Sequence, residues 1–180
     1  MAFVMKEVFN LFLPFEVKER ADKVLEEWDD ICRELKITHF LMEGTCLGMV
    51  RDNGYIEGDN DIDVGVICTY GELKRLTKKL SEHGFEVGRK LKETQHFHKY
   101  GVLLDVRFSF GSHKRFLVPF DKTYHNSRLY NVPHPVEEYL KARYGNWRTP
   151  KKELKKITMT TLKKIFCYIV PTRVRAQSNF

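Results

Sequence analysis

The segment from residue 43 to residue 66 reads EGTCLGMVRDNGYIEGDNDIDVGV and places acidic residues inside an apolar run. Asp61 and Asp63 alternate with apolar residues that would otherwise indicate a buried strand at 61–68. Because side chains on a strand alternate between its two faces, both carboxylates point the same way. Two neighbouring carboxylates repel each other and need a counter-charge to remain ionised together. The sequence therefore predicts a strand that carries a pair of acids on one face.

A divalent cation can supply that counter-charge, since Mg²⁺ binds one or two carboxylates together with waters and substrate phosphates. Gly44 and Thr45 follow a predicted strand at 37–43 and open a short helix that Thr45 could cap and that runs through Arg51. Free backbone N–H groups at such a turn can hold a phosphate. Taken alone, the Asp-x-Asp pattern is common, and turn residues followed by an acid at the rim explain it as well.

Asp105 interrupts a second apolar strand, VLLDVRF at 102–108. An unpaired buried carboxylate is costly. Arg107 is a poor partner for it, because residues i and i+2 of a strand lie about 7 Å apart. Convergence on Mg²⁺ or Mn²⁺ explains the acids better than separate structural roles do. The three acids in question are Asp61, Asp63 and Asp105.

The apolar spacing predicts an α/β (α+β) domain with a small mixed β-sheet flanked by helices. Gly111 and Ser112 indicate the turn of a β-hairpin formed by residues 100–110 and 115–120. The remaining expected elements are helices at 16–36, 71–83, 135–144 and 151–170 and a strand at 85–91.

Three parts of the chain resemble the LicD/fukutin family. GTCLGMVRDNGYIEGDNDIDVGV resembles its signature, Gly-Thr-x-Leu-Gly-x-x-Arg, a loop, an isoleucine and Asp-x-Asp-Ile-Asp. LLDVRF at 103–108 resembles the strand that carries the third acid. NVPHPVEEYLKARYGNWRTP at 131–150 resembles the closing motif of a proline, a short helix and Tyr-Gly. The resemblance covers about residues 20–150 and implies a nucleotidyltransferase fold.

The resemblance implies a metal-dependent transferase with a CDP-linked donor. Its cargo would be a phosphorylated alcohol, such as phosphocholine, ribitol phosphate or glycerol phosphate, and its acceptor the hydroxyl of a glycan or similar small molecule. The implied ligands of Mg²⁺ or Mn²⁺ are Asp61, Asp63 and Asp105. Asp105 would otherwise be the base that takes the acceptor proton.

The resemblance also implies a phosphate site lined by Gly44 and Thr45. Arg51 would contact phosphate or brace the acidic loop, since a guanidinium group suits either role. Two departures bear on the donor site. Glu57-Gly58 stands where family members often have Pro-Trp, and Asn60 interrupts the run of aspartates.

Two other functions use the same fold. A minimal nucleotidyltransferase would transfer a nucleotide to a small molecule, a protein or RNA, with the same acids. An inactive nucleotide-binding module would retain the fold without the chemistry, and the three retained acids argue against it.

Several further residues are candidate site residues, and each also has a simpler structural explanation. His96 and His98 could face the cleft and contact a donor phosphate or transfer a proton, or they could be an exposed pair on an edge strand. Arg107 shares a face with Asp105 and either neutralises phosphate or is a surface charge. Asp59 is two residues before Asp61 and would share its face on a strand, but we expect Asp59 in the loop. A polar cluster that could hold a base or sugar, or form a plain loop, comprises Tyr124, His125, Asn126, Arg128 and Tyr130.

The formal charge of +7 is concentrated in residues 151–180, which hold eight basic residues and one acidic residue. The first 150 residues are therefore neutral, and we expect no nucleic-acid partner. We divide the chain into a catalytic domain at 1–150 and a basic amphipathic helix and tail at 151–180. This helix would pack on the domain or lie on an anionic membrane surface.

The four cysteines are scattered, without the paired spacing of a zinc knuckle, and indicate a reduced compartment. The apolar N-terminal stretch is too short and too often interrupted for a membrane span, and it lacks the cleavage site of a signal peptide. We therefore expect a cytoplasmic protein, with peripheral membrane contact as an option.

Overall fold

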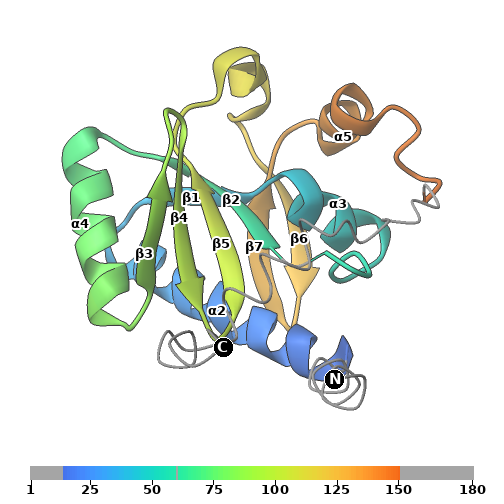
Figure 1. Cartoon of the computed structure of the whole chain (residues 1–180). Coiled ribbons are helices and arrows are strands. Elements are labelled where there is room, and N and C mark those ends of the chain that lie inside the picture. Colours follow the sequence, from blue (N-terminus) through green and yellow to red (C-terminus); the bar gives the residue numbers. More distant parts are fainter. Residues whose placement is uncertain (1–13, 60, 151–180) are drawn as a thin grey trace, which may run out of the picture. The chain divides into compact units, whose positions relative to one another are not determined.

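A five-stranded mixed sheet is the centre of the fold (Figure 1). The structure is a computed structural model that describes residues 14–59 and 61–150. Across the sheet the strands are β1 (Thr38–Leu41), β2 (Asp61–Ile67), β5 (Val102–Arg107), β4 (Thr94–Lys99) and β3 (Glu86–Lys90). Strands β2 and β5 are parallel, and the other neighbours are antiparallel. The predicted mixed sheet with flanking helices is confirmed.

Within residues 14–59 and 61–150, four helices flank this sheet: α2 (Pro14–Glu34), α3 (Glu43–Arg51), α4 (Tyr70–Glu82) and α5 (Val136–Tyr144). Helix α2 packs against β1, β5 and α4, whereas α3 packs against β2 and α5. In Figure 1, α4 lies beside the edge strand β3, and α3 and α5 lie at the other side of the sheet. The helices predicted at 16–36, 71–83 and 135–144 are therefore present, and the helix predicted at 151–170 lies outside the described residues.

Alternation along β2 and β5 gives the sheet two different faces. Ile62, Val64 and Val66 of β2 are buried, and Leu104 and Val106 of β5 join them in the core. Burying these side chains removes apolar surface from water and supplies most of the stability of the sheet. The opposite face carries Asp61 and Asp63 of β2 and Asp105 and Arg107 of β5, and these side chains are half-buried. The apolar face thus stabilises a second, partly open face that carries the acids.

The predicted hairpin at 100–110 and 115–120 is wrong. Strand β5 pairs instead with β4, through a turn at Tyr100-Gly101 in which both residues have positive φ angles, 52° and 76°. Residues 111–116 form the short 3₁₀ helix η1 (Gly111–Phe116). Phe116 and Leu117 are consecutive and both buried, so this stretch does not alternate as a strand would.

A second hairpin follows η1, formed by β6 (Asp121–His125) and β7 (Arg128–Val132). The cluster at residues 124–130 lies on this hairpin rather than in a polar loop. His125 and Tyr130 are buried, and His125 Nε2 lies 2.7 Å from Asp22 Oδ1. Both side chains therefore serve the packing of the hairpin on α2.

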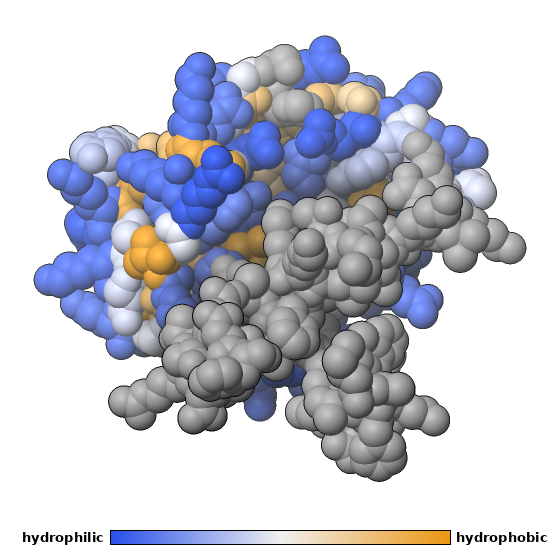
Figure 2. All heavy atoms as spheres, in the orientation of Figure 1, coloured by the Kyte–Doolittle hydropathy of each residue, from blue (hydrophilic) through white to orange (hydrophobic). Residues whose placement is uncertain are grey.

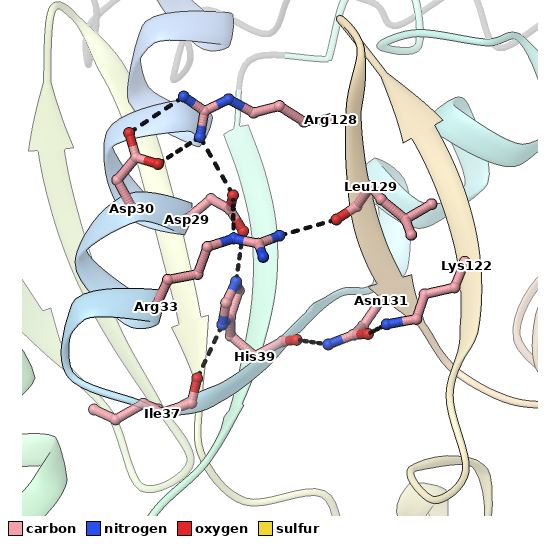
Figure 3. Close-up of polar contacts among 9 residues, drawn as sticks. All are labelled: Asp29, Asp30, Arg33, Ile37, His39, Lys122, Arg128, Leu129 and Asn131. Atoms are coloured by element: carbon pink, nitrogen blue, oxygen red, sulfur yellow. Dashed lines mark hydrogen bonds and ion pairs between the residues drawn. The ribbon is translucent and has the colours of Figure 1, made fainter.

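A buried carboxylate on α2 anchors this hairpin (Figure 3). Asp29 is only 1% exposed and accepts hydrogen bonds from Arg33 Nε at 2.8 Å and Arg128 Nη1 at 3.4 Å. His39 Nε2 of β1 lies 2.7 Å from its other oxygen. Asn131 Nδ2 donates to the His39 carbonyl at 2.7 Å. The network thus ties α2, β1 and the β6–β7 hairpin to one another.

In the part of the chain that the structure describes, no helix is long and apolar enough to cross a membrane. The coloured part of the face in Figure 2 is mostly hydrophilic, with small hydrophobic patches between the charged side chains. Isolated apolar side chains of this kind are normal on protein surfaces.

Replacing Asp29 should destabilise the fold much more than replacing its neighbour Asp30. Burial opposes ionisation of Asp29, but hydrogen bonds from His39 and Arg33 outweigh it and lower the pKa of the carboxyl. Asp29→Ala removes a buried partner and should reduce the free energy of unfolding by about 3 kcal/mol. The side chain of Asp30 is 60% exposed and pairs with Arg128, so Asp30→Ala should cost less than about 1 kcal/mol.

Urea denaturation of both variants measures this difference. Equal losses of stability in the two variants would show that the network does not anchor the hairpin.

Candidate active site

Three hydrogen bonds fix Asp63 against the turn between β1 and α3. The Gly44 N–H donates to Asp63 Oδ2 at 2.9 Å, the Asp63 N–H donates to Thr45 Oγ1 at 2.8 Å, and the Met42 N–H donates to the Asp63 carbonyl at 3.1 Å. The expectation that Thr45 caps α3 is wrong, because the cap residue is Met42 and no side chain caps the helix. The Thr45 hydroxyl holds β2 instead, and the Gly44 N–H faces a carboxylate.

The parallel register of β2 and β5 places Asp63 and Asp105 directly side by side. Asp61 lies two residues earlier on the same face of β2, and His96 of β4 lies opposite Asp105. The distance from His96 Nε2 to Asp105 Oδ2 is 3.8 Å. All four side chains are half-buried. The sheet therefore brings together acids that are about forty residues apart in sequence.

Within the described chain, Asp63 and Asp105 have too little counter-charge for both to be ionised. Burial raises the pKa of Asp63 to about 7, the charge of Asp61 adds to the shift, and the Gly44 hydrogen bond opposes it. Burial also raises the pKa of Asp105, although the charges of His96 and Arg107 oppose the shift. Asp105 Oδ1 is buried and has no hydrogen-bond partner in the described chain. Such a site favours either a proton or a cation.

The acidic loop reaches the same place through Asp59. A Cβ atom added to Gly44 would lie 2.6 Å from Asp59 Oδ2 and 3.1 Å from Asp63 Oδ2. A side chain at position 44 would therefore crowd two carboxylates that approach the backbone, and Asp59 would have to shift. Gly48 has the same role one turn later, because a Cβ there would meet the carbonyl oxygen of Gly54. The two glycines of the motif thus allow the loop to lie against α3.

Glu43 is an acid of this site that the sequence analysis did not select. It is 8% exposed and has a φ angle of +46°. Its N–H donates to the Tyr139 hydroxyl at 3.0 Å, and its Oε2 accepts a hydrogen bond from Arg143 Nε. Its charge contributes to the raised pKa values of both Asp63 and Asp105. The sequence feature that could have indicated Glu43 is its place directly between an apolar strand and the Gly44-Thr45 pair.

The remaining predicted residues lie around the acids with different partners. Arg51 donates to the Asp52 carboxylate at 2.8 and 2.6 Å and to the Trp147 carbonyl at 3.3 Å, so it connects the end of α3 to the segment after α5. Arg107 lies on the same face of β5 as Asp105 and pairs with Gly65 of β2. His98 packs over Gly88 of β3, one row away from His96.

Among residues 14–59 and 61–150, no three carboxylate, imidazole or thiol groups form a complete metal centre. The donor set nevertheless fits a divalent cation that takes its other ligands from water and substrate. Such cations use one or two carboxylates in this way. The buried, unpartnered Oδ1 of Asp105 and the raised pKa of Asp63 are the observations that support this fit.

The mixed sheet and its helices define a nucleotidyltransferase fold. The solution structure of the antibiotic-resistance factor ANT(2'')-Ia aligns with a TM-score of 0.50 and 12% identity, over 73% of this chain and 80% of that chain. The crystal structure of the lincosamide antibiotic adenylyltransferase LnuA, with lincomycin bound, aligns with a TM-score of 0.47 and 13% identity, over 64% of this chain and 79% of that chain.

The chain belongs to the LicD/FKTN/FKRP family. The family model for the nucleotidyltransferase domain of these proteins matches residues 36–165, which is most of the chain. The suspected relationship is therefore confirmed, and the protein is an enzyme of the transferase type with nucleotide-related chemistry. No curated protein matches the sequence.

Asp63 should make the metal-free protein less stable at high pH. An unfolded aspartate titrates near pH 4, whereas the pKa of Asp63 in the folded chain is about 7. The folded state therefore binds more protons between these values, and the free energy of unfolding falls as pH rises through that window. Asp63→Asn removes this penalty. Relative to wild type, the variant should gain of the order of 2 kcal/mol between pH 5 and pH 8.

Urea denaturation in the presence of a chelator measures this change, with Asp30→Asn as an exposed control. A stability difference between Asp63→Asn and wild type that is the same at both pH values would contradict the raised pKa.

Proposed function

We propose that the protein is a metal-dependent transferase. It moves a phosphorylated alcohol, such as phosphocholine, ribitol phosphate or glycerol phosphate, from a CDP-linked donor to a hydroxyl of a glycan or similar small acceptor. The pairing of Asp63 with Asp105, next to Asp61, carries this proposal. Family membership supports it, because the match includes the segments that hold all three acids.

In this proposal Asp61 and Asp63 hold Mg²⁺ or Mn²⁺, and Asp105 is either a third ligand or the base that takes the acceptor proton. When bound, the cation neutralises negative charge on the donor diphosphate. Phosphoryl transfer depends mainly on positioning and charge neutralisation. The hydrogen bonds from Gly44 and to Thr45 fix Asp63 before substrate arrives. Gly44 and Thr45 would therefore act on the donor-phosphate site through the position of Asp63.

In the alternative role, Asp105 would take the proton of the acceptor hydroxyl. Burial raises the pKa of Asp105, and its Oδ1 has no hydrogen-bond partner in the described chain; both features favour a carboxylate that can accept a proton. His96 Nε2 lies 3.8 Å from the other oxygen of Asp105, within ion-pair range. Arg107 offers positive charge to a donor phosphate on the same face. Arg51 bonds to Asp52 at the end of α3 and to the Trp147 carbonyl, so its proposed role is to hold α3 against the segment after α5. His98 is a minor candidate for phosphate contact.

Nucleotidyl transfer to a small acceptor is the second candidate. The description of the matched family domain as a nucleotidyltransferase favours it, and it would use the same acids. Product analysis separates the two reactions, because nucleotidyl transfer leaves the nucleoside monophosphate on the acceptor, whereas the proposed reaction releases it as CMP.

Asp61→Ala and Asp63→Ala should each abolish transfer from CDP-choline, CDP-ribitol or CDP-glycerol while the protein remains folded. The loss follows because each change removes one of the carboxylates that hold the cation. Release of CMP in the presence of Mg²⁺ or Mn²⁺ is the measurement, and circular dichroism reports the fold. Asp30→Ala is the matched control. Turnover retained by either site variant would reject the assignment.

We also propose that residues 1–150 form the catalytic domain and that residues 151–180 add a basic helix and tail to a cytoplasmic enzyme. The tail would hold the enzyme at an anionic membrane surface, near lipid-linked acceptors. Positive charges near such a surface contribute about 1 kcal/mol each. Replacing Lys156, Lys163 and Lys164 by glutamine should therefore reduce co-sedimentation with phosphatidylserine vesicles at least tenfold.

The control replaces three exposed lysines of the domain, Lys74, Lys78 and Lys92, in the same full-length chain. Equal co-sedimentation of the two variants would dismiss a membrane role for the tail.

A further inference from the structure

Glu43 and Arg143 join helix α5 to the acidic face. Arg143 is on the last turn of α5 and donates from Nε to Glu43 Oε2, one residue before Gly44. Tyr139 of the same helix accepts the Glu43 N–H. Helices α3 and α5 are neighbours at this end of the fold (Figure 1). The closing motif therefore brings a guanidinium group to the edge of the acidic site.

The Glu43–Arg143 pair has features that a simple tether between helices does not require. Glu43 Oε1 is buried and has no hydrogen-bond partner in the described chain. The backbone of Glu43 is in the left-handed region, at a φ angle of +46°. Its charge also lies near the charges of Asp63 and Asp105. Each feature is destabilising, and such costs are concentrated at functional sites.

Arg143 is accessible to a ligand despite its pairing. Its side chain is 39% exposed, and in the part of the chain that the structure describes only its Nε donates a hydrogen bond. The planar guanidinium group can therefore present its terminal nitrogens to an anion, in the geometry that suits phosphate. Glu43 fixes the direction of that group.

Arg107 and Arg143 approach the acids of β2 from opposite sides. Strands β1 and β5 flank β2 on opposite sides. Arg107 is at the end of β5, whereas Glu43, with Arg143, follows the end of β1. The acids Asp61 and Asp63 on β2 lie between these approaches. A diphosphate placed over the acids would meet one cationic group on each side.

We propose that Arg143 binds a phosphate group of the nucleotide diphosphate donor and that Glu43 holds it in position for this contact. This inference rests on the proposed function, since it assumes a diphosphate at the acidic face. It assigns a binding role to the closing helix of the domain, which provides the arginine, and a positioning role to the acid before the Gly-Thr pair.

Calorimetric titration of the full-length chain with inorganic pyrophosphate and with CDP, both with Mg²⁺, tests the proposal. Arg143→Gln should weaken both affinities about tenfold or more, the usual effect of one charge-assisted contact. Arg143→Lys should retain part of the affinity because it keeps the charge. The control is Arg148→Gln, because Arg148 pairs with the exposed Glu137 close to the same helix, and it should bind as wild type does.

The unfolding temperature separates binding from structure. If Arg143→Gln lowers the unfolding temperature but binds pyrophosphate like wild type, the arginine is only a tether and the inference is overturned. If wild type binds the ligands and only the Arg143 variants lose affinity, the inference stands. If wild type itself binds neither pyrophosphate nor CDP, the proposed function and this inference both fail.

Discussion

The attachment of Asp63 to the β1–α3 turn is the constraint on which the site depends. One residue accepts from Gly44, donates to Thr45 and accepts from Met42, so a central strand and a helix start are fixed to each other. Because the carboxylates of Asp59 and Asp63 both approach the Gly44 backbone, a side chain at position 44 would crowd the site. The left-handed backbone of Glu43 and the approach of Asp59 belong to the same crowded corner.

This corner concentrates negative charge, and the rest of the fold stabilises it. The buried face of β2 and β5 is purely apolar around Val64 and Val106, which offsets the cost of half-buried acids on the opposite face. The Asp29 network anchors the β6–β7 hairpin, and β6 in turn packs against α3. Distant polar contacts therefore support the helix whose first residues shape the site.

Local patterns were sufficient to predict the elements that carry the chemistry. Alternation identified the strands of Asp61 and Asp105, and apolar spacing identified the major helices. The prediction of a hairpin at 100–120 was wrong because the apolar run at 115–120 does not show whether it pairs with the preceding strand or packs into the core. Helix η1 does the second, through Phe116 and Leu117.

Long-range contacts explain why other features of the site were missed. The partners of Glu43 are Tyr139 and Arg143, about a hundred residues later, and no local pattern indicates them. Thr45 was expected to cap the helix because Ser and Thr commonly have that role. Its hydroxyl instead accepts a hydrogen bond from the backbone N–H of Asp63 on β2. The side-by-side placement of Asp63 and Asp105 likewise depends on a parallel register that forms only in the folded sheet.

The central claim is that the acids of β2 and β5 share a divalent cation with a nucleotide diphosphate. A crystal structure with Mn²⁺ and CDP, analysed by anomalous scattering, tests it most directly. We expect an anomalous peak within coordination distance of Asp61 and Asp63, with the diphosphate of CDP on the open face of the sheet. A peak elsewhere, or CDP bound without any ion at these carboxylates, would contradict it.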